Sequence, residues 1–226
     1  MTKVWYLRNT GIFRGLSDED VRMIDRHSLM QQIRRGQPIY LQGAPANNVY
    51  ILKKGVVKIN RLTSQGREIT LDIIREGSIF GEMSLADPAE MNESAEAIED
   101  GVICAMKKED MERFIQKIPI LSVRVSQMMG FRRYSIENKL VDLLFRTVEQ
   151  RFAKTLMSLV DDFGIPHVDG ILLNIRLTHK DFAALIASTR ETVTATVNNL
   201  KHKGVIGIED KYLVIKSLDG IRAITG

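Results

Sequence analysis

The pattern of hydrophobic and polar positions changes several times along this 226-residue chain. Between residues 31 and 106, apolar and polar residues alternate in short runs separated by glycines, which is typical of antiparallel strands and turns. From residue 107, apolar residues recur at steps of three or four, which predicts helices. Residues 165–177 return to short apolar runs before a further helical region begins at Thr178. We therefore expect an antiparallel β-barrel or sandwich, then helices, then a small mixed domain.

Two short helices are predicted at the edges of the strand-rich region. In residues 17–27, Ser17 can cap a helix, acidic residues occupy the first turn, and Val21 and Ile24 form the inner face. Residues 107–117 have acids early and a lysine late. Both segments therefore have the charge order that favours a helix.

A long helix is predicted from Pro119 to Thr147, and a second helix over residues 148–164 that ends at Gly164. The long helix carries a narrow apolar stripe, interrupted by Arg132, which indicates packing against another helix. At about 1.5 Å per residue it exceeds the depth of a small barrel. Two partners are open, the chain's own domain and a second copy of the chain, and the length of the helix favours the second copy. The residues assigned to the dimer interface are Val125, Met129, Ile136, Leu140 and Leu143.

Residues 177–206 have the spacing of two short helices joined by a turn. Thr178 and Asp181 form a capping-box pair for the first helix, and Thr189 can cap the second. This is the pattern of a helix-turn-helix, and the hairpin sequence "VIGIEDKYLVIK" that follows makes it a winged helix. The predicted inner faces are Phe182, Leu185 and Ile186 on the first helix and Val193, Val197 and Leu200 on the second.

The second helix of this motif has an outer face suited to reading DNA. Arg190 can bind guanine O6 and N7, and Glu191 can accept from cytosine N4. Five basic and two acidic residues lie between residues 176 and 203, an excess that suits a phosphate backbone. The residues predicted to contact DNA are Arg190, Glu191, Thr194, Thr189, His179, Lys180 and Lys201, with Ala195 on the same face and Lys203 nearby.

The composition excludes several other classes of protein. The net charge of +4 permits a polyanionic partner without demanding one. The single cysteine, Cys104, lies in an apolar run, so we expect a buried strand residue and neither a disulfide nor an iron–sulfur cluster. The N-terminal "MTKVWYLRNTGIF" lacks the pattern of a signal peptide, and no apolar run is long enough to span a membrane. The expected compartment is therefore the cytoplasm.

Two motifs in this order carry a resemblance to a known family. "STRETVTATVNNLKHKGVI" resembles the recognition helix of the cyclic AMP receptor protein and fumarate–nitrate reduction regulator (CRP/FNR) family, and "GSIFGEMSL" resembles its phosphate-binding cassette. The resemblance implies an α+β fold with a cupin-like β-roll sensor (residues 1–118), a dimerisation helix (119–147) and a winged helix-turn-helix (148–226). It also implies a homodimeric transcription regulator that binds palindromic double-stranded DNA and contacts RNA polymerase.

The cassette departs from the family pattern at one position. In members that bind cyclic nucleotides, a Glu holds the ribose and an Arg-Ser pair holds the phosphate; here Glu82 and Ser94 match, but Glu93 replaces the arginine. A carboxylate in that place changes the interaction with a phosphate by several kcal/mol at an effective dielectric constant of about 20. We therefore expect no control by cyclic AMP. The tentative effector pocket comprises Gly81, Glu82, Met83, Ser84, Glu93, Ser94, Ile136 and Glu137.

The four histidines are isolated in sequence, so we expect no haem and no metal site, and the barrel region has no histidine for cupin catalysis. An enzyme is therefore not expected. A regulator gated by a cyclic nucleotide or another small ligand in an altered pocket remains open, as does a ligand-binding module without DNA binding. The sequence does not decide between activation and repression.

Overall fold

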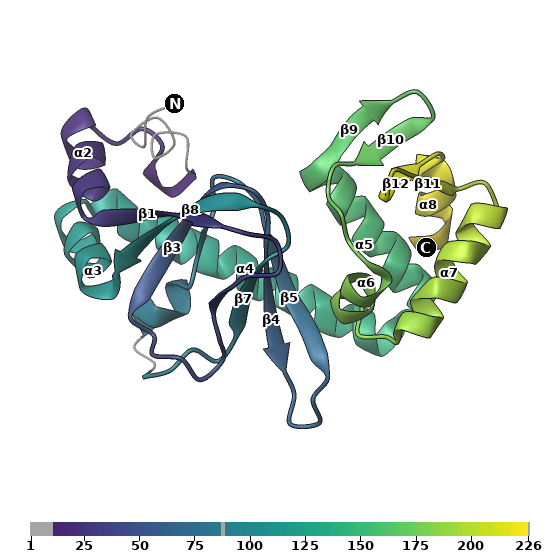
Figure 1. Cartoon of the computed structure of the whole chain (residues 1–226), viewed down its shortest axis with the longest axis horizontal. Helices are drawn as coiled ribbons and strands as arrows, with labels where there is room; N and C mark the ends of the chain where they lie inside the picture. The colour runs from purple at the N-terminus through teal and green to yellow at the C-terminus, as the bar shows by residue number, and fades with distance from the viewer. Residues whose placement is uncertain (1–10, 87–88, 226) are drawn as a thin grey trace. The chain divides into compact units, whose positions relative to one another are not determined.

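The computed structural model describes residues 11–86 and 89–225 (Figure 1). By its internal packing the chain divides into two compact units. The first holds the barrel and extends to Tyr134, and the second contains the chain from Ser135 onward together with Glu68–Thr70. The predicted boundaries after residues 118 and 147 remain predictions, and residues 1–10 of the N-terminal segment lie outside the described part. Among the described residues no helix is long and apolar enough to cross a membrane.

The barrel consists of two four-stranded sheets, built from short antiparallel strands of the kind that the alternating pattern predicts. The strand orders are β1-β8-β3-β6 and β2-β7-β4-β5, and the pairs β1–β8, β3–β8, β2–β7 and β4–β7 are antiparallel. The first sheet comprises β1 (Ser28–Ile33), β8 (Gly101–Lys107), β3 (Asn48–Lys54) and β6 (Ile79–Phe80). The second comprises β2 (Pro38–Tyr40), β7 (Ser94–Ala97), β4 (Val57–Leu62) and β5 (Glu68–Ile74).

Alternation along these strands builds two separate hydrophobic cores. Leu52 and Ile103 belong to a cluster that joins residues of both sheets, including Val57, Ile59 and Ala95. Their strand neighbours Ile51 and Cys104 belong to a different cluster. The reason is geometric, because successive side chains of a strand point to opposite faces. Cys104 is fully buried in β8, which confirms the prediction for the free thiol.

Helices cover the outer face of the first sheet. They are the 3₁₀-helix η1 (Gly11–Phe13), α2 (Asp18–Arg26), α3 (Lys108–Lys117) and the start of α4 (Pro119–Phe145), and α2 and α3 lie beside β1 and β3 (Figure 1). Val21 and Ile24 are buried in the same cluster as Ile51, as predicted. Ser17 caps α2 by accepting a hydrogen bond from the amide of Asp20 at 3.1 Å.

The second unit is a winged helix-turn-helix. Its sheet has the order β11-β12-β10-β9, and α6 and α7 form the helical pair. Thr178 and Asp181 form the predicted capping box, and Thr189 caps α7. The elements are α5 (Val148–Phe163), β9 (Gly164–His167), β10 (Gly170–Leu173), α6 (His179–Leu185), α7 (Arg190–His202), β11 (Ile206–Glu209), β12 (Tyr212–Ile215) and α8 (Leu218–Thr225).

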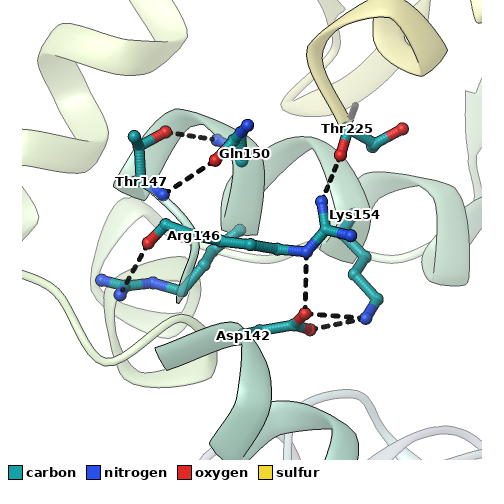
Figure 2. Close-up of polar contacts among 7 residues, drawn as sticks. Asp142, Arg146, Thr147, Gln150, Lys154 and Thr225 are labelled. Carbon is teal, nitrogen blue, oxygen red and sulfur yellow. Dashed lines mark hydrogen bonds and ion pairs between the residues drawn. The ribbon is translucent and has the colours of Figure 1, made fainter. Parts of the chain in front are cut away.

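A network of charged groups fixes the junction of α4 and α5 (Figure 2). Asp142 of α4 accepts from Lys154 of α5 at 2.8 Å and pairs with Arg146 at 3.0 Å. Arg146 also donates to the backbone carbonyl of Thr225 at the end of α8. Beside it, Thr147 and Gln150 form a capping box that starts α5. One carboxylate and one guanidinium thereby hold the ends of three helices together.

The structure confirms that α5 ends at Gly164, and it differs from the prediction at Val125. Gly164 ends α5 in an extended conformation, with φ −71°, instead of the left-handed one common at helix ends. A Cβ at this position would lie 2.4 Å from the carbonyl oxygen of Val160, so the glycine is required for close approach of the backbone. Val125, assigned to the dimer interface, is buried in the core that covers the first sheet, and Met129 packs against the same core.

Candidate effector pocket and DNA-binding face

The cassette sequence forms a tight turn followed by the 3₁₀-helix η2 (Glu82–Ala86). Gly81 adopts φ +72°, and a Cβ there would lie 2.9 Å from the ring of Tyr50, so only glycine fits. The turn carries Glu82 and Ser84 into the interior, where they are 3% and 0% exposed. The sequence between two strands therefore delivers a carboxyl group to a buried position.

Arg132 of α4 is the cation that meets this carboxyl group. It forms a close ion pair with Glu82 through Nη1 and Oε1, and its Nη2 donates to the carbonyl oxygen of Ile79 at 2.7 Å. Its Nε lies 3.6 Å from a carboxylate oxygen of Asp72. All three guanidinium nitrogens thus engage the barrel. The contact fixes α4 to the cassette without any other molecule.

Glu93 lies in the same cluster and is only 8% exposed. Tyr40 donates its hydroxyl to Oε1 of Glu93 at 3.1 Å. Burial raises the pKa of Glu93, and the nearby charge of Glu82 raises it further, while the Tyr40 hydrogen bond and Arg132 oppose the shift. Burial, and then Glu93, also raise the pKa of Tyr40.

The carboxyl groups of the cluster also raise the pKa of Arg132, against the effect of its burial. Burial alone would lower the pKa of Arg132, but Glu82, Asp72 and Glu93 together raise it. One guanidinium is therefore surrounded by three carboxyl groups, and the cluster as a whole is acidic. A second anion would meet repulsion here that a cation or a hydrogen-bond donor would not.

Two buried oxygens of the cassette stay available. Within the described residues, Oε2 of Glu82 and Oγ of Ser84 have no hydrogen-bond partner. Ser94 differs, because its Oγ accepts from the amide of Gln42 at 2.8 Å. Ile136 and Glu137 are exposed and belong to the second unit, so their place in a pocket remains a prediction.

The sequence pattern does not place Arg132 or Tyr40 at this site. In that pattern, Arg132 only interrupts the apolar stripe on the long helix. The interruption was itself the signal, because a charged residue on a helical face that packs against a core requires a partner. Tyr40 offered no signal, since a tyrosine in a strand is usually explained by packing.

The DNA-binding face is built on the packing of α7. Val193, Val197 and Leu200 are buried, as predicted, and this leaves the opposite side of the helix to solvent. The predicted contact residues Arg190, Glu191, Thr189, Lys180 and Lys201 are all exposed, as is Ala195, while Thr194 and His179 are half-buried. Lys203 differs in that its Nζ lies 3.1 Å from a carboxylate oxygen of Glu149 on α5.

We predict that Glu93→Gln stabilises the protein at neutral pH. A folded-state pKa above the unfolded value means that stability falls as pH rises from the unfolded pKa through the folded one. Glutamine removes this ionisation and keeps an acceptor for Tyr40. The melting temperature of the variant should exceed that of the wild type at pH 7.5, and the difference should shrink toward pH 5. Glu112→Gln, on α3 outside the cluster and with a side chain 43% exposed, is the matched control. A lower melting temperature for Glu93→Gln at pH 7.5 would contradict the prediction.

Comparisons with known proteins agree with both halves of the structure. Residues 30–118 match the model of the cyclic nucleotide-binding domain, and residues 150–224 match that of the Crp-like helix-turn-helix domain. The CRP-like cAMP-activated global transcriptional regulator of Mycobacterium tuberculosis is 30% identical over 209 residues, covering 92% of this chain and 93% of the relative. The global nitrogen regulator of Synechococcus elongatus is 33% identical over 188 residues, covering 82% and 85%.

Solved structures show the same fold. The c-di-GMP responsive global regulator CLP of Xanthomonas campestris superposes with a TM-score of 0.79 at 19% identity, covering 89% of this chain and 100% of that one. A CRP-family transcriptional regulator of Thermus thermophilus gives 0.75 at 25% identity, covering 87% and 96%. With a barrel, a long helix and a winged helix-turn-helix in one order, the chain belongs to the CRP/FNR family of DNA-binding transcription regulators and is not an enzyme.

Proposed function

We propose that this protein is a homodimeric regulator that binds a palindromic DNA site and is not controlled by cyclic AMP. The absence of control by cyclic AMP is supported by the acidic cluster, in which Arg132 is already paired with Glu82. RNA polymerase is the expected protein partner, and the cytoplasm is the expected compartment.

Cyclic AMP is an anion, and the cluster offers it no free cation. Among the described residues of the cluster, the guanidinium of Arg132 is held by Glu82, by the carbonyl oxygen of Ile79 and by Asp72. Glu93 stands where cyclic-nucleotide binders of the family have an arginine, and it is buried. A bound phosphate would have to displace a carboxylate from Arg132 and also approach Glu93. Each step opposes binding.

The homodimer is supported by the surface of α4. Beyond the part that packs on the barrel, the helix has many large apolar side chains in solvent, an arrangement that indicates a protein partner. The predicted interface residues Ile136, Leu140 and Leu143 are among them, whereas Val125 is buried within its own chain. The exposed apolar residues of α4 are Ile120, Val123, Phe131, Tyr134, Ile136, Leu140, Val141, Leu143, Leu144 and Phe145.

The alternative is a regulator gated by a different small ligand in the altered pocket. The observation that favours it is the pair of buried oxygens, Oε2 of Glu82 and Oγ of Ser84, without partners among the described residues. Buried polar atoms are normally hydrogen-bonded, so a ligand that donates hydrogen bonds would suit this position. Such a ligand would be neutral or cationic at the end that faces the cluster.

The test of DNA binding is selection of duplexes from a random pool by the ligand-free protein at fixed salt. We expect a palindrome with half-sites about one helical turn apart. Arg190→Ala should then lose roughly 1–3 kcal/mol of specific affinity per half-site, because the bidentate contact to guanine is removed. Arg222→Ala, on α8 and paired with Asp219, is the control that should bind normally. An unchanged sequence preference for Arg190→Ala would exclude its role in base reading.

The test of the dimer is a charge placed on α4. Leu140 is 56% exposed in a single chain, so Leu140→Lys should leave the fold intact and weaken self-association at least tenfold. Sedimentation over a concentration series measures this change. Val168→Lys, at a side chain 93% exposed outside α4, is the control. Equal association of both variants and the wild type would show that α4 is not the interface.

The test of the effector is calorimetry with cyclic AMP. The wild type and Glu93→Gln should show no micromolar binding, since neither has a free cation at the site. Glu93→Arg should gain measurable affinity, because it restores a phosphate-binding guanidinium next to Ser94. Micromolar binding of cyclic AMP by the wild type would overturn this part of the proposal.

A further inference from the structure

Thr194, near the start of α7, has its hydroxyl group engaged twice. Its Oγ1 donates to the backbone carbonyl oxygen of Arg190 at 2.8 Å. The same oxygen lies 2.8 Å from Nδ1 of His179, the first residue of α6. The two helices of the motif are therefore joined by a polar contact in addition to their apolar faces.

The proton positions in this chain of bonds follow from the chemistry of the groups. A carbonyl oxygen carries no proton, so the single hydroxyl proton of Thr194 must lie on the bond to Arg190. The bond to His179 then requires a proton on Nδ1, with the threonine oxygen as the acceptor. In the neutral ring, Nε2 of His179 consequently bears a lone pair and is an acceptor, which is unsuitable for a DNA phosphate.

With its hydroxyl engaged twice, the group that Thr194 has left for a further contact is its methyl group. The hydroxyl has no proton left to donate to a base, and its position is fixed by two bonds. The next residue, Ala195, is exposed and contributes a second methyl group. Arg190 and Glu191, one turn earlier, are exposed and polar. The outer face of α7 thus changes from charged to apolar within a single turn.

We propose that Thr194 and Ala195 form an apolar contact that recognises the C5-methyl group of a thymine, beside the base pair read by Arg190 and Glu191. Threonine and alanine methyl groups are suited to this contact in the major groove. His179 is a positioning residue, which holds the threonine so that its methyl group, and not its hydroxyl, is presented. This inference rests on the proposed sequence-specific DNA binding and adds which base the second turn of α7 reads.

The experiment uses the full-length protein and the palindrome that it selects. Each thymine of the half-site is replaced in turn by deoxyuridine, which lacks only the C5-methyl group and keeps every hydrogen-bonding group. At one position per half-site, we expect affinity to fall about fourfold, the loss for one buried methyl-sized group. The other positions should change little.

Paired variants assign the contact to the methyl group. Thr194→Ser keeps the hydroxyl and loses the methyl group, so the preference for thymine over deoxyuridine at that position should fall, with Ala195 alone left to make the contact. Thr194→Val keeps a methyl group at that place and should retain the preference. Thr196→Ser is the matched control, because Thr196 makes the same hydroxyl bond to a backbone carbonyl, that of Thr192 at 2.9 Å, on another side of α7.

A second pair tests the positioning role of His179. His179→Ala should reduce the thymine preference, and His179→Asn should restore it, because the asparagine amide can donate from nearly the same place as Nδ1. A purely structural role would lower overall affinity without changing the ratio of the two duplexes. If the protein binds a specific palindrome with no thymine whose methyl group matters, or if Thr194→Ser keeps the preference, the inference is wrong while the proposed function stands. Failure to select any specific site would instead remove the proposed function.

Discussion

The ion pair between Arg132 and Glu82 is the interaction on which the sensor half of this molecule depends. A guanidinium that packs against a barrel loses its water, and such a loss is tolerated only with close, well-directed partners. Here the partners are a carboxylate on η2, a carbonyl of β6 and a carboxylate of β5. Because one end of this contact is in α4, the long helix and the cassette are held in one arrangement by the chain itself.

Glu93 has two electrostatic effects in this cluster. Considered as a single replacement, it removes the cation that a phosphate requires. Within the cluster it also adds to the negative potential that holds the positive charge on Arg132. The same carboxyl group thereby opposes an anionic effector and supports an internal cation. Burial and Glu82 both raise the pKa of Glu93, so its charged form is less favourable in the folded protein than in water.

The DNA-binding half relies on helix caps, on a charged junction and on the buried face of α7. Capping groups start α5, α6 and α7, and the junction around Asp142 holds the ends of α4, α5 and α8 together (Figure 2). On α7, one buried face fixes which residues are presented to a groove. Within that presented face, the bonds of Thr194 to Arg190 and His179 decide which chemical group of the threonine is available.

The sequence by itself determined the elements and their order. Strand alternation, the caps at Ser17, Thr178 and Thr189, and the apolar faces of α6 and α7 all depend on neighbours within a few residues, and the structure confirms them. The replacement of the family's arginine by Glu93 was also visible in the sequence. Tertiary structure alone decided the partners of Arg132, the burial of Val125 in its own chain and the bond of His179 to Thr194. These contacts join residues from 15 to more than 50 positions apart, or depend on which face of a helix meets the barrel. Local periodicity cannot specify either, because it fixes which residues share a face but not what that face will contact.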